Sequence, residues 1–393
     1  MKKKIAFVVQ RYGLEVNGGS ELSCRLIAEK LSQHYEVEIL TTKALDYVTW
    51  QNHYPEDIEK INGITVRRFK TDFPRESKVF NKINEQVFTK PQKNIYDELE
   101  WMKAQGPASF ELIEYIQRSQ NQYHKIIFFT YLYFTTFFGL PQAAEKAILV
   151  PTAHDEPYIY FSMFKPLFHL PQSIVFLTEE EKQFVHKTFN NQYINNVVAG
   201  VGVDVPDKEI NIHAFKDKFK VNDDFILYVG RIDESKGCKE LFDYYLEYKK
   251  KEPDAPKLLL MGKSVIDIPK HPDIIPLGFV SDEEKFAAMK LAKILMMPSK
   301  FESLSMVVLE SLYYETPVLV NGHCDVLVGH CDRGNAGLYY TDYNEFEFCL
   351  NVMLKNDDLR GKMGTSGKEY VIKYFDWEII IDKFIACIDR ENT

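Results

Sequence analysis

Two carboxylates lie where an apolar strand gives way to a helix, within residues 297–319 of this chain. Glu302 precedes the expected helix and Glu310 lies inside it. The unpaired amides and the positive end of the dipole at a helix N-terminus favour a carboxylate there, and the same amides can hold a phosphate or a sugar hydroxyl. The segment therefore predicts a cradle for a polar ligand, in which the glutamates could form an acid and base pair or hold the ligand.

A pair of cations stands upstream, in a turn that follows the expected strand of residues 225–229. Gly230 and Gly237 bound this turn, and Arg231 and Lys236 lie between them. Glycines let a backbone approach an anion closely, and the two side chains add charge-assisted donors. The turn has the composition of a pyrophosphate clamp, although a solvated charged turn could have the same sequence. The two glutamates in the same half of the chain favour the clamp.

A third turn follows the first expected strand, residues 5–9, and leads into a helix over residues 20–31. Gly18 and Gly19 permit a tight turn with accessible amides, and Asn17 or Ser20 could cap the helix. The spacing differs from the Gly-x-Gly-x-x-Gly fingerprint of dinucleotide-binding proteins. By itself the turn indicates no more than a connection between a strand and a helix.

His154 follows the expected strand of residues 147–150, together with Asp155 and Glu156. Ligands of open α/β sheets bind outside the carboxyl ends of the strands, so this position suits a ligand contact. A surface or structural histidine is the alternative. The acidic neighbours would favour a charged imidazole, or they could cap a helix.

Parallel strands must position these turns, and the chain has two series of short apolar runs that alternate with amphipathic stretches. The first series predicts strands at residues 5–9, 37–40, 64–69, 126–129, 147–150, 174–177 and 196–199. The second predicts strands at residues 225–229, 257–261, 274–277, 294–297 and 317–320, with helices near residues 238–250 and 281–291. Polar, helix-prone sequence at about residues 75–120 interrupts the first series, and we interpret it as a helical insertion.

The domain organisation follows from a linker between the two series. Glycine and proline gather at residues 200–206, and a charged run then extends to residue 224. A length of 393 residues suggests two or three domains at about 150 residues each. We therefore expect an α/β protein of two Rossmann-like domains, residues 1–203 and 204–375, whose facing sheet ends would form a ligand cleft.

Composition narrows the classes of partner and compartment. The formal net charge of −9, with no concentrated basic face, argues against a nucleic-acid partner. The N-terminus has a basic start without a long apolar region, which predicts a cytoplasmic protein. The apolar run of residues 126–140 is shorter than the roughly 18 residues of a membrane span, so we expect it to be buried, although its aromatic residues 128–138 could line a channel.

Two histidine–cysteine pairs, at residues 323–324 and 330–331, suggest a metal site at first sight. They lack the Cys-x2-Cys spacing of usual zinc ligands, so we expect a loop with two thiols near the ligand cradle instead. The six cysteines are scattered through a long chain, which favours reduced thiols.

The three turns, in this order, resemble those of the retaining GT-B glycosyltransferases of family four, the glycosyl transferases group 1. That family has a Gly-Gly turn after its first strand, a G-R-x4-K-G segment at the start of its second half, and a Glu-x7-Glu motif after Pro-Ser. This chain has Gly18-Gly19, the segment 230–237, and Glu302 and Glu310 after Pro298-Ser299. The resemblance extends to the F-D-W-E stretch at residues 375–378, and it implies that residues 376–393 form a helix that returns to the N-terminal domain.

The resemblance implies roles for the matching positions. Arg231 and Lys236 would neutralise the departing donor diphosphate, Glu310 would accept hydrogen bonds from the ribose, and Glu302 would contact hydroxyls of the transferred sugar. His154 would touch the donor sugar. The donor-binding backbone would include Gly18, Gly19, Gly230, Ser303, Leu304, Ser305, Met306 and Val307. Ser303 and Ser305 replace glycines that are frequent in the family, so we expect them to affect which sugar is accepted.

The chemistry of such a transfer agrees with these roles. Cleavage at the anomeric carbon builds negative charge on the diphosphate, so fixed cations at the leaving group should be the main catalytic device and no metal cofactor is required. The two-carboxylate scheme of glycoside hydrolases is not implied. In retaining enzymes of this type, the departing phosphate oxygen would receive the proton of the acceptor on the same face.

The leading prediction is thus a glycosyltransferase that uses a nucleotide sugar, by default a UDP-sugar with a GDP-sugar as the alternative, to build a polysaccharide, glycolipid or similar glycan. A lipid-linked acceptor would bring the protein to the inner face of the cell membrane, although no basic amphipathic helix stands out as an anchor. Two alternatives share the architecture. One is a nucleotide-sugar epimerase, and the other is a non-catalytic protein that binds nucleotide sugars.

Overall fold

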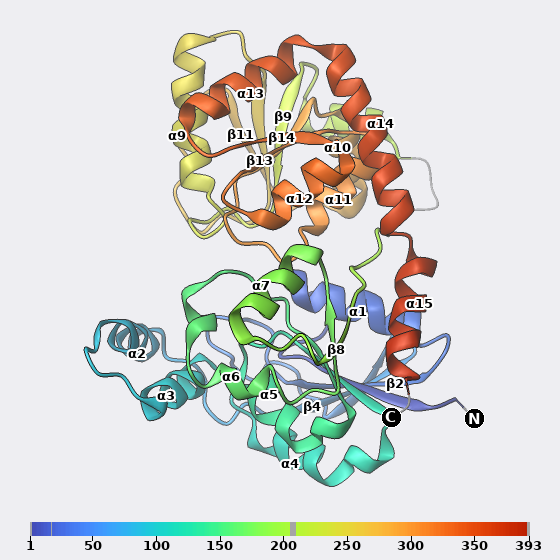
Figure 1. Cartoon of the computed structure of the whole chain (residues 1–393). Coiled ribbons are helices and arrows are strands. Elements are labelled where there is room, and N and C mark those ends of the chain that lie inside the picture. The colour runs from blue at the N-terminus through green and yellow to red at the C-terminus, as the bar shows by residue number, and fades with distance from the viewer. Residues whose placement is uncertain (1, 17, 205–209, 391–393) are drawn as a thin grey trace. The chain divides into compact units, whose positions relative to one another are not determined.

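The computed structural model describes residues 2–16, 18–204 and 210–390. The chain divides into two compact units (Figure 1). The N-terminal unit comprises Met1–Val201 and Ile380–Thr393, and the C-terminal unit comprises Gly202–Ile379. The predicted boundary at residues 203–204 falls close to this division, whereas part of the predicted linker, residues 205–206, lies outside the described residues.

The N-terminal unit is built on an eight-stranded sheet with the order β3-β4-β2-β1-β5-β6-β7-β8. Its pairings are parallel except that of β3 with β4. The central strands are buried apolar runs, as expected for a sheet covered on both faces. The strands are β1 Lys4–Val8, β2 Glu36–Thr42, β3 Ile58–Ile61, β4 Ile64–Phe69, β5 Lys125–Phe129, β6 Ala147–Val150, β7 Ser173–Phe176 and β8 Asn195–Val198.

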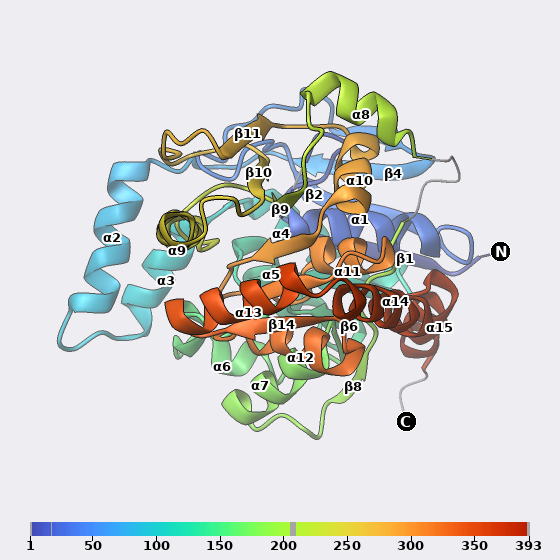
Figure 2. The same ribbon diagram turned by 90° about the horizontal axis from the view of Figure 1, so that it is seen from above.

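Helices connect these strands, and the predicted insertion is helical. In Figures 1 and 2, two of its helices, α2 and α3, lie together at one side of the N-terminal unit. The helices of this unit are α1 Gly19–Leu31, α2 Ser77–Thr89, α3 Ile95–Gln105, α4 Phe110–Ser119, α5 Phe134–Gly139, α6 Phe164–Leu167 and α7 Glu179–Phe189, with 3-10 turns at Gln120–Gln122, Leu140–Lys146 and Pro157–Tyr160. The final helix, α15 Trp377–Ile388, belongs to this unit from Ile380 onward.

The aromatic run of residues 128–138 packs inside the N-terminal unit. Phe128, Phe129, Tyr131 and Phe134 are all at most 1% exposed. Phe128, Tyr131 and Phe134 join one hydrophobic cluster with residues of the insertion. Each large aromatic ring removes considerable apolar surface from water, so this run stabilises the unit. Burial confirms the packing interpretation for these four residues.

The C-terminal unit has a six-stranded parallel sheet with the order β11-β10-β9-β12-β13-β14. The strands are β9 Phe225–Val229, β10 Lys257–Met261, β11 Ile274–Gly278, β12 Ile294–Met297, β13 Val318–Asn321 and β14 Gly337–Tyr340. The helices are α8 Ile212–Phe219, α9 Cys238–Lys251, α10 Asp282–Leu291, α11 Met306–Tyr313, α12 Asp325–Gly334, α13 Tyr343–Lys355 and α14 Asp357–Tyr374. Because β9 and β12 are neighbours, the turns that follow them lie at the same edge of the sheet.

All of the predicted strands are present, and their observed ends differ from the predicted ends by at most two residues. The sequence pattern missed the strands β3 and β14. It also missed several helices, which are α6, α7, α8, α12, α13 and α14. The strand β3 has two adjacent charged residues between its terminal isoleucines, and β14 is a short run that begins with glycine. Such short segments become strands through pairing with β4 and β13, which is a tertiary effect.

None of the described helices combines the length and the apolarity that crossing a bilayer requires. All six cysteines are free thiols. Four of them, Cys24, Cys238, Cys324 and Cys331, are buried.

Candidate functional site

The turn between β9 and α9 presents the two predicted cations. Arg231 forms an ion pair with Asp233 through its Nε atom. Asp233 also accepts hydrogen bonds from the Ser235 hydroxyl, at 2.7 Å, and from the Lys236 amide, at 2.8 Å. Burial would raise the pKa of Asp233, but these hydrogen bonds and the charge of Arg231 lower it overall. Asp233 is therefore an anion that shapes the turn and orients Arg231.

Lys236 joins this turn to the segment that follows β12. Its Nζ atom lies 2.6 Å from Oε1 of Glu302, and both side chains are partly exposed. Gly237 makes the approach possible, because it has a φ of +73° and a Cβ atom at this position would collide with the carbonyl of Pro298. The structure thus brings together a cation and a carboxylate that are 66 residues apart in the chain.

Glu310 lies on α11 and is buried. Its Oε1 atom accepts from Lys285 of α10 at 2.9 Å, whereas no described group donates a hydrogen bond to Oε2. Burial raises the pKa of Glu310 by more than Lys285 lowers it. A buried acceptor without a donor is costly, so hydroxyl groups of a ligand would stabilise this oxygen.

The segment between Glu302 and α11 turns sharply at Ser305. Ser305 is the N-cap of the helix and has a φ of +63°, and its side chain makes no capping hydrogen bond. The geometry of a helix leaves the amides of Met306 and Val307 without intrahelical acceptors. The first turn of α11 therefore offers donors at the edge where β9 and β12 end.

The prediction that residues 323–331 form a loop with two thiols is wrong, because most of this segment is the helix α12. His330 is completely buried, and its ring contacts the Leu304 carbonyl through Nε2 at 2.7 Å and the Tyr370 hydroxyl through Nδ1 at 3.0 Å. Cys331 is buried in the same helix. No group of three or more potential metal ligands occurs among the residues the structure describes.

The predicted Gly-Gly turn of the N-terminal unit contains an ion pair that the sequence did not reveal. Arg11 donates through Nε and Nη2 to Oε1 of Glu21, at 2.9 and 2.5 Å, and both side chains are buried. Gly18 is the N-cap of α1, and a Cβ atom at this position would collide with the Glu21 carboxylate. Gly19 has open space around it. The sequence does place Arg11 and Glu21, which have opposite charges, on either side of this turn, and that arrangement could have predicted the ion pair.

His154 lies beyond the carboxyl end of β6, at the same edge of the N-terminal sheet as the Gly18 turn after β1. Its Nε2 atom is 3.5 Å from Oε2 of Glu156, and Oε1 of Glu156 accepts from the Tyr131 hydroxyl at 2.6 Å. The preceding residue, Ala153, donates its amide to the buried Glu181 carboxyl at 2.6 Å. Glu181 was not predicted, since nothing in its local sequence distinguishes it from its neighbours Glu179 and Glu180.

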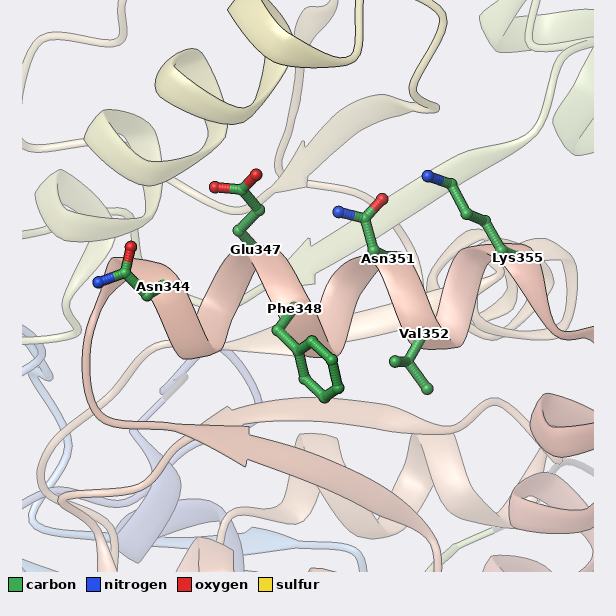
Figure 3. A pocket seen from close by; sticks show the side chains of 6 residues that line it. All are labelled: Asn344, Glu347, Phe348, Asn351, Val352 and Lys355. Atoms are coloured by element: carbon green, nitrogen blue, oxygen red, sulfur yellow. The ribbon is translucent and has the colours of Figure 1, made fainter.

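A hollow on the outer side of α13 involves none of the predicted site residues (Figure 3). Glu347, Asn351 and Lys355 point to one side of the helix, where they contact Lys251, Tyr248 and Glu252 at 2.6, 3.0 and 2.9 Å. Phe348 and Val352 point away from these side chains. These polar contacts join α13 to α9 and to the residue that follows α9, so they account for the polar side chains here without a ligand.

Comparison with known proteins points to one family. Residues 209–370 match the family model described as glycosyl transferases group 1. A mannosylfructose-phosphate synthase from Agrobacterium fabrum is 21% identical over 192 residues, which are 44% of this chain and 42% of that protein. The aligned region thus spans less than half of this curated relative.

Several solved structures have a similar fold over almost the whole length of this chain. Sucrose-phosphate synthase from Thermosynechococcus elongatus has a TM-score of 0.69 at 14% identity, covering 98% of this chain and 97% of its own. Anabaena HepE in complex with UDP and glucose has a TM-score of 0.70 at 14% identity, covering 98% and 99%. A structure described as trehalose-6-phosphate from E. coli, bound with UDP-2-fluoro glucose, has a TM-score of 0.68 at 12% identity, covering 99% and 100%. These likenesses establish the GT-B fold of the two units.

Proposed function

We propose, from the premise that this chain is a glycosyltransferase of group 1 type with a GT-B fold, that it transfers a sugar from a nucleotide sugar with retention of anomeric configuration. A UDP-sugar is the proposed donor, and a glycan or lipid-linked molecule is the proposed acceptor. The product would belong to a polysaccharide or glycoconjugate.

The observation that carries this proposal is the meeting of Lys236 with Glu302, where Nζ and Oε1 are 2.6 Å apart. The two residues come from turns that follow neighbouring strands of one sheet, with Arg231 in the first of those turns. A cation and a carboxylate at one sheet edge suit a ligand that carries both a diphosphate and sugar hydroxyls.

The cations would do most of the catalytic work. As the bond between the anomeric carbon and the diphosphate breaks, negative charge develops on the leaving oxygen, and Arg231 and Lys236 would stabilise it. Asp233 holds Arg231 in the turn through an ion pair. This chemistry requires no metal ion, because the fixed side chains supply the positive charge.

The carboxylates would bind the donor. The Oε2 atom of Glu310, which lacks a donor among the described groups, would accept hydrogen bonds from the ribose hydroxyls. Glu302 would release part of its contact with Lys236 to bind hydroxyls of the sugar. The amides of residues 303–307 would contact the donor, and Gly18, Gly19, Gly230 and His154 would complete the binding groups. The departing phosphate oxygen would then accept the proton of the attacking hydroxyl on the same face of the sugar.

Support for UDP comes from structures of similar fold. The HepE structures contain UDP, UDP with glucose, or UDP-glucose, and the E. coli structure contains UDP-2-fluoro glucose. Those ligands are facts about the proteins that bind them. They make UDP-sugars the first donors to test here.

The test is incubation of the purified chain with UDP-, GDP- and ADP-sugars, followed by chromatography of the nucleotides. Slow release of a nucleoside diphosphate is the expected result, because transferases of this kind pass sugar to water when no acceptor is present. Return of the nucleotide sugar with an inverted stereocentre would instead indicate an epimerase. Binding without turnover, even with a cell extract as the source of acceptors, would indicate a non-catalytic protein, and either outcome would overturn the proposal.

A further inference from the structure

His330 connects the core of the C-terminal unit to the proposed donor site. It lies on α12, it is 0% exposed, and its ring is flanked by Tyr370 and Phe375, with ring centroids 6.0 and 5.8 Å away. Both ring nitrogens have partners, the Leu304 carbonyl and the Tyr370 hydroxyl. A buried imidazole that reaches the backbone of another segment fixes the position of that segment.

The partners determine the direction of each hydrogen bond. The Leu304 carbonyl can only accept, so Nε2 of His330 must carry a hydrogen and donate it over 2.7 Å. In the neutral ring Nδ1 is then the acceptor, and the Tyr370 hydroxyl donates to it over 3.0 Å. Tyr370 thus orients the ring, and His330 holds the carbonyl.

The held carbonyl stands immediately before the turn that begins α11. Ser305 adopts the left-handed conformation, with φ +63° and ψ +73°, which is unfavourable for a residue with a side chain. Since the Ser305 side chain makes no capping hydrogen bond, other contacts must maintain the turn. The burial of Leu304, at 3% exposed, and the hydrogen bond from His330 are the contacts that anchor the preceding residue.

We propose that His330 is a positioning residue, which fixes the Leu304 carbonyl and thereby aims the Ser305 turn and the first amides of α11 at the donor. This inference rests on the proposed function, because it assigns the turn a role in holding the nucleotide sugar. His330 itself would not touch the donor. Loss of its hydrogen bond would let the Ser305 turn relax and would weaken donor binding more than it weakens the fold.

The test uses three substitutions that divide the two hydrogen bonds. His330→Gln can keep a hydrogen-bond donor at the position of Nε2. His330→Asn keeps an acceptor near Nδ1 but cannot reach Leu304. Tyr370→Phe removes the hydroxyl that contacts Nδ1 and leaves Nε2 in place. We expect His330→Asn to weaken UDP binding about 5- to 10-fold in calorimetry, as one lost hydrogen bond implies, and His330→Gln to restore most of it. Tyr370→Phe should have a smaller effect on UDP binding.

A matched control is His323→Asn, at an exposed histidine that precedes the same helix and contacts the Thr341 carbonyl at 3.2 Å. It should leave UDP binding unchanged. Urea unfolding of all variants measures the stability loss. If His330→Asn and Tyr370→Phe lose equal stability while both bind UDP like the parent protein, His330 is a structural histidine and the inference is overturned.

Hydrogen–deuterium exchange separates this inference from the proposed function. A peptide covering residues 302–309 should exchange faster in His330→Asn than in the parent protein or in His323→Asn. If the parent protein binds none of UDP, GDP and ADP, the proposed function fails, and unchanged exchange in His330→Asn would independently overturn the role of His330. Faster exchange would support it without any nucleotide.

Discussion

At the scale of single residues, the ion pair of Lys236 and Glu302 lies at the centre of the proposed donor site. The two side chains are about a third or less exposed and lie 2.6 Å apart. A donor diphosphate would compete with Glu302 for the ammonium group, which would free the carboxylate for the sugar. Binding would thus exchange one charge-assisted contact for two.

We predict that Lys236→Ala nearly abolishes turnover and leaves the fold intact. Removing one cation that stabilises a developing charge typically costs about 100- to 1,000-fold in rate. The measurement is the release of nucleoside diphosphate, with circular dichroism to verify folding.

Lys250→Ala is the matched control, because Lys250 lies on the exposed end of α9 and pairs only locally, with Glu247 at 2.8 Å among the described residues. Its turnover should equal that of the parent protein. Unchanged turnover in Lys236→Ala would remove the clamp from the mechanism.

Glu181 is a buried carboxyl group in the N-terminal unit, and its pKa is shifted. Burial raises its pKa to about 8, although amides of Leu177, Ala153 and Thr178 partly oppose the shift. The folded chain therefore binds the proton more tightly than the unfolded chain, whose carboxyl titrates near its ordinary value. The stabilisation is complete below that ordinary value and is lost as the pH rises through about 8.

We predict that the free energy of unfolding falls between about pH 5 and pH 8, by at most about 1.4 kcal/mol per pH unit from this group. Glu181→Gln should lower stability at pH 5 and flatten this dependence, because the amide cannot titrate. Urea titrations over a pH series measure it, with the exposed Glu179→Gln as the control. A slope in Glu181→Gln that equals the slope of the parent protein would refute the assignment.

At the scale of elements, the turn from β9 to α9 depends on a glycine where the chain turns left-handed. Gly237 combines a φ of +73° with a close approach to the Pro298 carbonyl. Both features oppose a side chain, so a glycine at this position lets the turn approach the segment after β12.

We predict that Gly237→Ala separates Lys236 from Glu302 and reduces turnover at least tenfold, with a stability loss of about 1–3 kcal/mol from the strained backbone. Gly361→Ala is the control, since Gly361 lies inside α14 with open space around its Cα and alanine favours a helix by about 1 kcal/mol. Urea unfolding and nucleotide release measure both variants. If Gly237→Ala matched the parent protein in both, the close approach would be unimportant.

At the scale of the whole molecule, the chain crosses from the C-terminal unit back to the N-terminal unit within α15. Residues from Ile380 onward group with the N-terminal unit, where Ile380, Phe384 and Ile388 are completely buried. Polar contacts reinforce them, since Asp389 accepts from Lys3 at 2.9 Å. The C-terminal segment is thus part of the core of the N-terminal unit.

We predict that Phe384→Ala destabilises the N-terminal unit by about 3–5 kcal/mol, as expected for a phenylalanine removed from a core. Ile379→Ala, at a position that is 39% exposed, should cost much less. Hydrogen exchange resolved by peptide would show where protection is lost. Equal losses in the two variants would contradict the assignment of this segment to the core.

The sequence by itself determined the positions of most strands and the residue types of the candidate site. Strands β6, β9, β10 and β12 coincide with the predicted ranges, because each is a largely buried apolar run. Strand β4 also coincides, and its first four residues alternate between apolar and polar. Arg231, Lys236, Glu302 and Glu310 were predicted because glycines, cations and carboxylates have recognisable spacing around such strands. These are local signals, which a single chain segment carries.

Only the tertiary structure decided which groups meet. It paired Lys236 with Glu302 and Lys285 with Glu310, and it placed His330 against the Leu304 carbonyl in a helix where the sequence indicated a loop. Such contacts join residues 25 to 66 positions apart. Their geometry follows from strand order and side-chain packing, which local patterns do not encode.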